Sequence, residues 1–165
     1  VAAGDVLIGL PSTGLHTNGF SLARRALLSH YMLESTPEML GGETIAEALL
    51  KVHRSYLRPI LHLLEIFDPA RDIHALSHIT GGGIVGNTSR VLNEGLSLSI
   101  DWNAWERPAI FLLIQEAGMV PEEEMRRAFN LGIGLILIVP SGKAGSIEIA
   151  LKEFGEAPVR MGNVV

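Results

Sequence analysis

Apolar runs and two-residue alternation along the chain predict four strands. Val1–Leu10 is predicted as one strand. Leu135–Val139 is apolar at every position, as in a central strand that is covered on both faces. Leu96, Leu98 and Ile100 alternate with polar residues, which predicts a half-buried strand. Val159 and Met161 indicate a last strand.

Apolar residues three or four positions apart predict helices between these strands. The first follows a loop and continues to about His30, which we place on its apolar face. A long amphipathic helix is predicted from Ile45 to Tyr56, with Val52 on its apolar face. Pro59 should kink or restart it, and Ile60–Phe67 is predicted as a second helical piece.

Proline, glycine and serine give the ends of the later helices. Trp105–Ala117 is predicted as a helix that ends at Gly118. Pro121 is expected at the first position of another, and Ser141 to cap a third. This order of strands and helices predicts an α/β or α+β fold: a mostly antiparallel or mixed sheet of about four or more strands, flanked by helices.

Length, charge and cysteine content limit the class of protein. At 165 residues the chain is one domain or slightly more. The net charge of −5 argues against a general nucleic-acid binder. The absence of cysteine excludes disulfides and thiolate chemistry and fits a reducing cytosol. No apolar run is long enough for a membrane span, and the N-terminus does not resemble a signal peptide. We therefore expect a cytoplasmic protein.

A loop of small polar residues joins the first strand to the first helix: Ser12-Thr-Gly-Leu-His-Thr-Asn-Gly-Phe-Ser-Leu22. Glycines, hydroxyls and a helix start place backbone N–H groups at one spot, which suits a phosphate or another anion. The alternative is a glycine-rich turn without a ligand, because Ser, Thr and Asn commonly cap helices.

His78-Ile-Thr-Gly-Gly-Gly83 is the second candidate site. Three successive glycines indicate a need for positive φ or for close approach to a ligand. Asn87 and Arg90 follow and are placed to meet phosphate oxygens; the alternative is a flexible connector. We expect this loop to converge with Ser12–Asn18 on one anion.

Two further motifs permit a structural interpretation. In Phe129-Asn-Leu-Gly-Ile-Gly134, Asn130 either contacts a ligand or fixes the turn into a buried strand. Trp105, Pro108 and Phe111 indicate core or interdomain packing. Of the six histidines only His16 and His78 lie in glycine-rich motifs, whereas His53, His62 and His74 have no partner at metal-ligand spacing.

Four motifs resemble those of aminoimidazole ribonucleotide synthetases, the phosphoribosylformylglycinamidine cyclo-ligases, and occur in the same order. They are the Ser12–Leu22 loop, His78–Gly83, Trp105-Glu-Arg-Pro-Ala-Ile-Phe111 and Phe129–Gly134. The chain resembles the C-terminal domain of that family along nearly its whole length. The resemblance makes residues 1–165 a single C-terminal domain of a two-domain enzyme whose N-terminal domain supplies the metal ligands, much of the ATP site and the main homodimer contact.

The resemblance also implies the chemistry. Such enzymes use ATP and Mg²⁺ to close the imidazole ring of formylglycinamidine ribonucleotide, a step of purine biosynthesis. The resemblance makes His16 the candidate catalytic residue and assigns no metal ligand to this chain. The implied nucleotide or substrate contacts are Ser12, Thr13, Thr17, Asn18, Gly19, His78, Gly81, Gly82, Gly83, Asn87 and Asn130.

Some residues depart from the family pattern, and other functions stay open. Val52-His53 stands where the family usually has Pro-Thr. One alternative is another ATP-using relative, such as a formylglycinamidine ribonucleotide synthetase-like enzyme. A second is a binding module that keeps the fold without the chemistry. The fragment alone is expected to be inactive as a cyclo-ligase.

Overall fold

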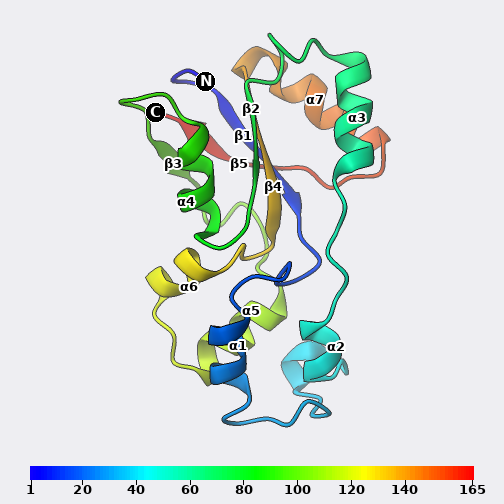
Figure 1. Cartoon of the computed structure of the whole chain (residues 1–165). Coiled ribbons are helices and arrows are strands. Elements are labelled where there is room, and N and C mark those ends of the chain that lie inside the picture. The colour runs from blue at the N-terminus through cyan, green and yellow to red at the C-terminus, as the bar shows by residue number, and fades with distance from the viewer.

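A five-stranded sheet forms the centre of the molecule (Figure 1), seen in a computed structural model that describes residues 1–165. Every strand pair is antiparallel, and the order across the sheet is β2-β4-β1-β5-β3. The strands are β1 Val6–Pro11, β2 Ala75–His78, β3 Leu98–Ile100, β4 Ile133–Val139 and β5 Val159–Val164. The predicted α+β fold with an antiparallel sheet is confirmed.

Both faces of the sheet are covered, because its central strands are apolar on both sides. Val6, Ile8 and Leu10 of β1 pack with α3 (Leu57–Ile66) and α7 (Ser141–Glu153). Leu7 points to the opposite face. There the short helices α4 (Gly83–Thr88) and η2 (Ser89–Val91) and the segment 92–105 cover it. In β4 every residue is buried, as the sequence predicts.

A separate helical cluster lies beyond the end of the sheet (Figure 1). It contains α1 (Phe20–Leu27), η1 (Glu38–Leu40), α2 (Ile45–Leu49), α5 (Ala109–Ala117) and α6 (Glu122–Ala128). These helices share a core of 16 buried residues, including Phe111 and Phe129. No helix has the combination of length and apolarity that crossing a bilayer requires.

The predicted helix from Ile45 to Tyr56 is wrong. It begins as expected, with the Thr44–Glu47 capping box, but α2 ends at Leu49 and Val52 is 85% exposed. Tertiary hydrogen bonds replace the helical ones beyond that point. The Val52 carbonyl accepts a bond from Thr13 Oγ1, and the Arg54 N–H donates to His16 Nε2.

Smaller errors concern element ends. β1 begins at Val6 because Asp5 Oδ2 accepts the Ala2 N–H and turns the preceding residues. Helix α5 begins at Ala109 because Pro108 disfavours helical geometry at Arg107. Pro121 and Pro140 precede α6 and α7, so Pro121 is not the first helical residue and the Ser141 side chain does not cap.

His30 is exposed rather than on a buried face, because α1 ends at Leu27. Other expectations are confirmed. Helix α5 ends at Ala117 with Gly118 as its C-cap, α3 carries Pro59 in its first turn, and β3 and β5 lie where alternation predicts them.

Candidate functional site

Three glycine-rich loops meet at one end of the sheet. Strand β4 is antiparallel to both β1 and β2, so the start of β4 lies beside the ends of both neighbours. The loops 12–19, 78–83 and 129–132 are therefore adjacent. The first two are joined directly, because Asn18 Oδ1 accepts the Gly81 N–H at 2.9 Å. The predicted convergence of these two loops is confirmed.

The 12–19 loop is folded by its own small polar side chains. His16, Thr17 and Gly19 have φ values of 51°, 61° and 74°, in the left-handed region. Thr17 Oγ1 and Asn18 Nδ2 both donate to the His16 carbonyl oxygen, at 2.6 and 2.7 Å. Thr13 and Thr17 remain exposed, and Ser12, Asn18 and Gly19 are partly exposed.

His16 lies inside the loop rather than in solvent. It is 2% exposed, although the loop around it consists mainly of small polar residues. Its Nε2 accepts the N–H groups of Thr13 at 3.0 Å and Arg54 at 3.3 Å. The residues after α2, which sequence reasoning made helical, provide this cover. Because Nε2 accepts, the neutral ring carries its proton on Nδ1, which is buried without a hydrogen-bond partner.

The surroundings of His16 hold it uncharged. Burial lowers its pKa to about 4, with smaller contributions from His53, His78 and Arg54. A neutral imidazole at physiological pH can exchange hydrogen bonds with a ligand but supplies no positive charge. The catalytic role of His16 remains a prediction.

Sequence reasoning missed His53 and Tyr56, which complete the surroundings of His16. The His53 ring stacks on His16 with centroids 4.0 Å apart and an angle of 18° between the planes. Its Nε2 lies 3.3 Å from Nε2 of His78, which is exposed at the end of β2. Tyr56 is buried and donates to the Pro11 carbonyl at 2.8 Å; burial raises the pKa of its hydroxyl.

No sequence signal indicates these contacts. His53 and His78 are 25 positions apart, on opposite sides of α3 in the chain. Only the pairing of β2 with β4 brings His78 to this position.

The triple-glycine loop has an internal and an accessible part. Asn87 is buried and donates from Nδ2 to the carbonyls of Gly83 at 2.8 Å and Thr80 at 3.1 Å, so its amide organises the loop. Gly83 is also buried, whereas Gly81 is exposed and Gly82 partly so. Because the Gly81 N–H donates to Asn18 Oδ1, the accessible N–H group of this loop is that of Gly82.

Gly83 serves packing. Its φ is 67°, and a Cβ there would lie 1.8 Å from the Arg126 carbonyl oxygen. Close approach between α4 and α6 is therefore sufficient reason for this glycine.

Asn130 joins the third loop to the first. It is 2% exposed, and its Oδ1 accepts from Ser12 Oγ at 2.9 Å and from the Gly132 N–H at 2.8 Å. Its Nδ2 donates to the Gly14 carbonyl at 2.8 Å. These bonds match the structural interpretation of Asn130, and contact with a ligand remains a prediction.

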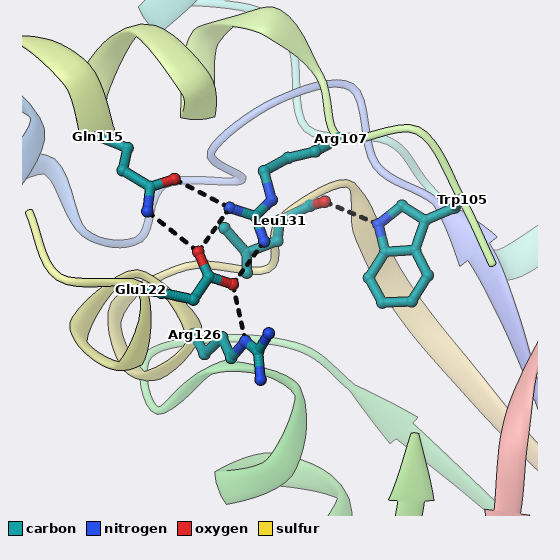
Figure 2. Close-up of polar contacts among 6 residues, drawn as sticks. All are labelled: Trp105, Arg107, Gln115, Glu122, Arg126 and Leu131. Carbon is teal, nitrogen blue, oxygen red and sulfur yellow. Dashed lines mark hydrogen bonds and ion pairs between the residues drawn. The ribbon is translucent and has the colours of Figure 1, made fainter. Parts of the chain in front are cut away.

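The Trp105 motif packs against the 129–132 turn (Figure 2). Trp105 Nε1 donates to the Leu131 carbonyl at 2.9 Å. Pro108 packs so closely on Gly132 that a Cβ there would lie 2.6 Å from its Cδ. The packing role predicted for Trp105 and Pro108 agrees with these contacts.

Arg107, from the same motif, binds Glu122 at the start of α6 through two hydrogen bonds of 2.7 and 2.9 Å (Figure 2). Arg126 Nε contacts the same carboxylate at 2.7 Å, and Gln115 Nε2 at 3.0 Å. The bonds from Arg107 are the main cause that lowers the pKa of Glu122 to about 2. This cluster fixes α5 and α6 around the turn.

Comparison with known proteins identifies the class to which this fold and these loops belong. The family described as "AIR synthase related protein, C-terminal domain" matches residues 2–165. The chain therefore belongs to that family.

Named relatives narrow the assignment. The phosphoribosylformylglycinamidine cyclo-ligase of Sorangium cellulosum is 47% identical over the whole chain and 47% of its own length. Those of Anaeromyxobacter dehalogenans and Symbiobacterium thermophilum are 46% and 43% identical, over 94% and 99% of the chain. The chain spans slightly less than half the length of these relatives.

A solved structure gives independent support for the fold. The protein tt0281 from Thermus thermophilus superposes with a TM-score of 0.59 at 20% identity, over all of this chain and 47% of that protein.

Proposed function

We propose that this chain is the C-terminal part of a phosphoribosylformylglycinamidine cyclo-ligase. The enzyme would convert formylglycinamidine ribonucleotide to aminoimidazole ribonucleotide with ATP, in purine biosynthesis in the cytoplasm. The observation that carries the proposal is 43–47% identity, over 94–100% of the chain, to relatives of that name. The remaining half of the protein would supply the other wall of the cleft and the homodimer contact.

Within this chain, we assign ligand contact to the accessible parts of the joined loops. Thr13, Thr17, His78 and Gly81 are exposed, and hydroxyls and N–H groups are donors suited to phosphate oxygens. The two hydroxyls and the Gly81 N–H donate to Val52, His16 and Asn18 in the structure, so a phosphate would take the place of those acceptors. The donor set therefore fits a nucleotide or a ribose phosphate. Gly83, Asn87 and Asn130 are buried and would act by holding these loops in shape.

The residues present do not fit Mg²⁺. This cation prefers an octahedron of oxygen ligands, usually with one or two carboxylates. No carboxylate belongs to the three loops, and no group of three His, Cys, Asp or Glu side chains is placed to hold a metal. We therefore assign no step of the reaction to a metal held by this chain.

The residues of this chain would contribute positioning and charge neutralisation. ATP, when bound, supplies the phosphoryl group that activates the formyl amide oxygen. The Thr13 and Thr17 hydroxyls and the Gly81 region would orient phosphate oxygens against that amide. His16, neutral at physiological pH, would act through hydrogen bonding if the loop opens to the ligand.

The test uses the protein in its full natural length. We expect ADP release coupled to formation of the imidazole product from formylglycinamidine ribonucleotide. Thr17→Val should lower kcat/KM about tenfold, the effect of one lost hydrogen bond of about 1.4 kcal/mol in the transition state. Because the variant also removes the bond from Thr17 Oγ1 to the His16 carbonyl, melting on the same preparation must show that it is folded. Asn103→Ala, exposed and outside the three loops, is the control and should match the unaltered protein.

Other results would redirect the assignment. Turnover of a different amide substrate would favour the formylglycinamidine ribonucleotide synthetase-like alternative. Ligand binding without any ADP release would favour a binding module. Equal kcat/KM for Thr17→Val and the control would remove the 12–19 loop from the site.

A further inference from the structure

His53 has no assigned role in the proposed reaction, and the proposed ligand contact of His78 does not account for the approach of these two rings. The rings come from separate elements: His53 from the irregular segment after α2, and His78 from the end of β2. Their Nε2 atoms are 3.3 Å apart, with ring centroids 5.3 Å apart and an angle of 37° between the planes. Two imidazole nitrogens thus lie close together although their residues are far apart in the chain.

These distances fit two histidines on one tetrahedral cation. With Zn–N distances of about 2.05 Å and an angle of about 109°, the Nε2 atoms lie about 3.3 Å apart and the centroids about 5.2 Å apart. A linear Nε2–H···Nε2 hydrogen bond of the same length would place the centroids about 5.6 Å apart. The observed centroid distance of 5.3 Å is closer to the first arrangement.

We propose that His53 and His78 form a two-histidine site for a divalent transition-metal ion of the Zn²⁺ type. Imidazole nitrogen suits Zn²⁺, Ni²⁺ and Cu²⁺, whereas Mg²⁺ prefers oxygen.

The protein supplies two ligands and no third. His16 stacks face to face on His53, so the edge of its ring points away from the pair, and its Nε2 already accepts N–H groups. No group of three metal-binding side chains exists. His78 is exposed and His53 partly so, which leaves the other two tetrahedral positions open to water or to a ligand oxygen.

The electrostatic surroundings agree with this assignment. The neighbouring cation Arg54 is paired with Glu156, with 2.5 Å between Nη2 and Oε2, which reduces its repulsion of a bound ion.

Calorimetric titration of the full-length protein with Zn²⁺, in excess Mg²⁺ to fill oxygen sites, tests the proposal. We expect Zn²⁺ binding that weakens at least tenfold in His53→Gln and in His78→Gln, because each variant loses one of two ligands. His62→Gln is the matched control. That ring stacks on Phe154, away from the pair, and its loss should leave the affinity unchanged.

The outcomes are decisive in both directions. Melting without metal shows whether each variant is folded. Equal Zn²⁺ affinity in folded His53→Gln and the unaltered protein, or no binding at millimolar Zn²⁺, would overturn the site and leave a hydrogen bond between neutral rings. Neither result bears on ADP release, so the metal site can fail while the proposed function stands.

Discussion

A methyl group on Gly83 would collide with the main chain of α6. The added Cβ would lie 1.8 Å from the Arg126 carbonyl oxygen, and φ of 67° is itself strained for alanine. We expect Gly83→Ala to lower the free energy of unfolding by about 3 kcal/mol or more, from strain and overpacking together. Urea titration followed by circular dichroism measures this change.

Gly86→Ala is the matched control on the same helix. An added Cβ there meets nothing within 4 Å, and Gly86 has no positive φ. Alanine should be neutral or slightly stabilising, since it favours helix by about 1 kcal/mol over glycine. Equal stability of the two variants would show that α4 does not approach α6 as described.

At the scale of residues, the sequence showed which positions are constrained better than it showed which contacts constrain them. Three glycines after His78 predict positive φ or close approach, and Gly82 and Gly83 have φ of 109° and 67°. The group that approaches Gly83 belongs to α6, more than 40 positions later, and no local pattern announces it. His16 shows the same limit, because a distant segment buries it.

Among the elements, α6 is attached to its neighbours through one carboxylate. Glu122 binds Arg107, Gln115 and Arg126, and its pKa of about 2 lies below the ordinary 4.5. A lowered carboxyl pKa stabilises the fold fully above about pH 4.5. That contribution is lost as pH falls from 4.5 through 2.

Glu122→Gln should therefore lower Tm at pH 7 and make no difference near pH 2. Solvent screens this half-exposed carboxylate, so we expect a loss on the order of 1 kcal/mol, or about 2–4 °C. Glu124→Gln, exposed in the same turn and without an ion pair, serves as the control. A Tm difference that persists undiminished at pH 2 would contradict the role of the charge.

Prediction of the elements succeeded where one physical signal dominated. β4 is apolar throughout and β3 alternates strictly, and both strands lie where expected. The segment after Leu49 has helical periodicity, yet Val52 and Arg54 use their backbone groups in bonds to the 12–19 loop. Tertiary contacts with a remote loop outweighed local propensity there.

For the whole molecule, the order β2-β4-β1-β5-β3 predicts unequal protection of the backbone. β1 and β4 have partners on both sides, whereas β3 is a short outer strand. Amides of β1 and β4 should exchange with deuterium slowest, and those of β3 faster. Peptide-resolved exchange by mass spectrometry measures the difference, and protection of β3 equal to that of β4 would refute the described order.

The same order explains which part of the candidate site the sequence could reveal. The motifs were visible as separate loops, and their glycines and hydroxyls predicted an anion site. The convergence of loops 12–19 and 78–83 was expected from their shared chemistry, whereas its cause, β4 lying between β1 and β2, is encoded by no motif. The His53–His78 contact follows from the same pairing and was invisible for the same reason.

The position of β1 also affects how the chain is made. Its residues leave the ribosome before any other strand of this domain, yet they pair only with β4 and β5, which begin at Ile133 and Val159. At a translation rate of about 5–20 residues per second, β4 is synthesised on the order of 10 s after Val6–Leu10, which has no strand to pair with until then. An apolar strand left unpaired for that time is a target for aggregation and for chaperones. During synthesis the first strand is therefore more exposed to aggregation than the last.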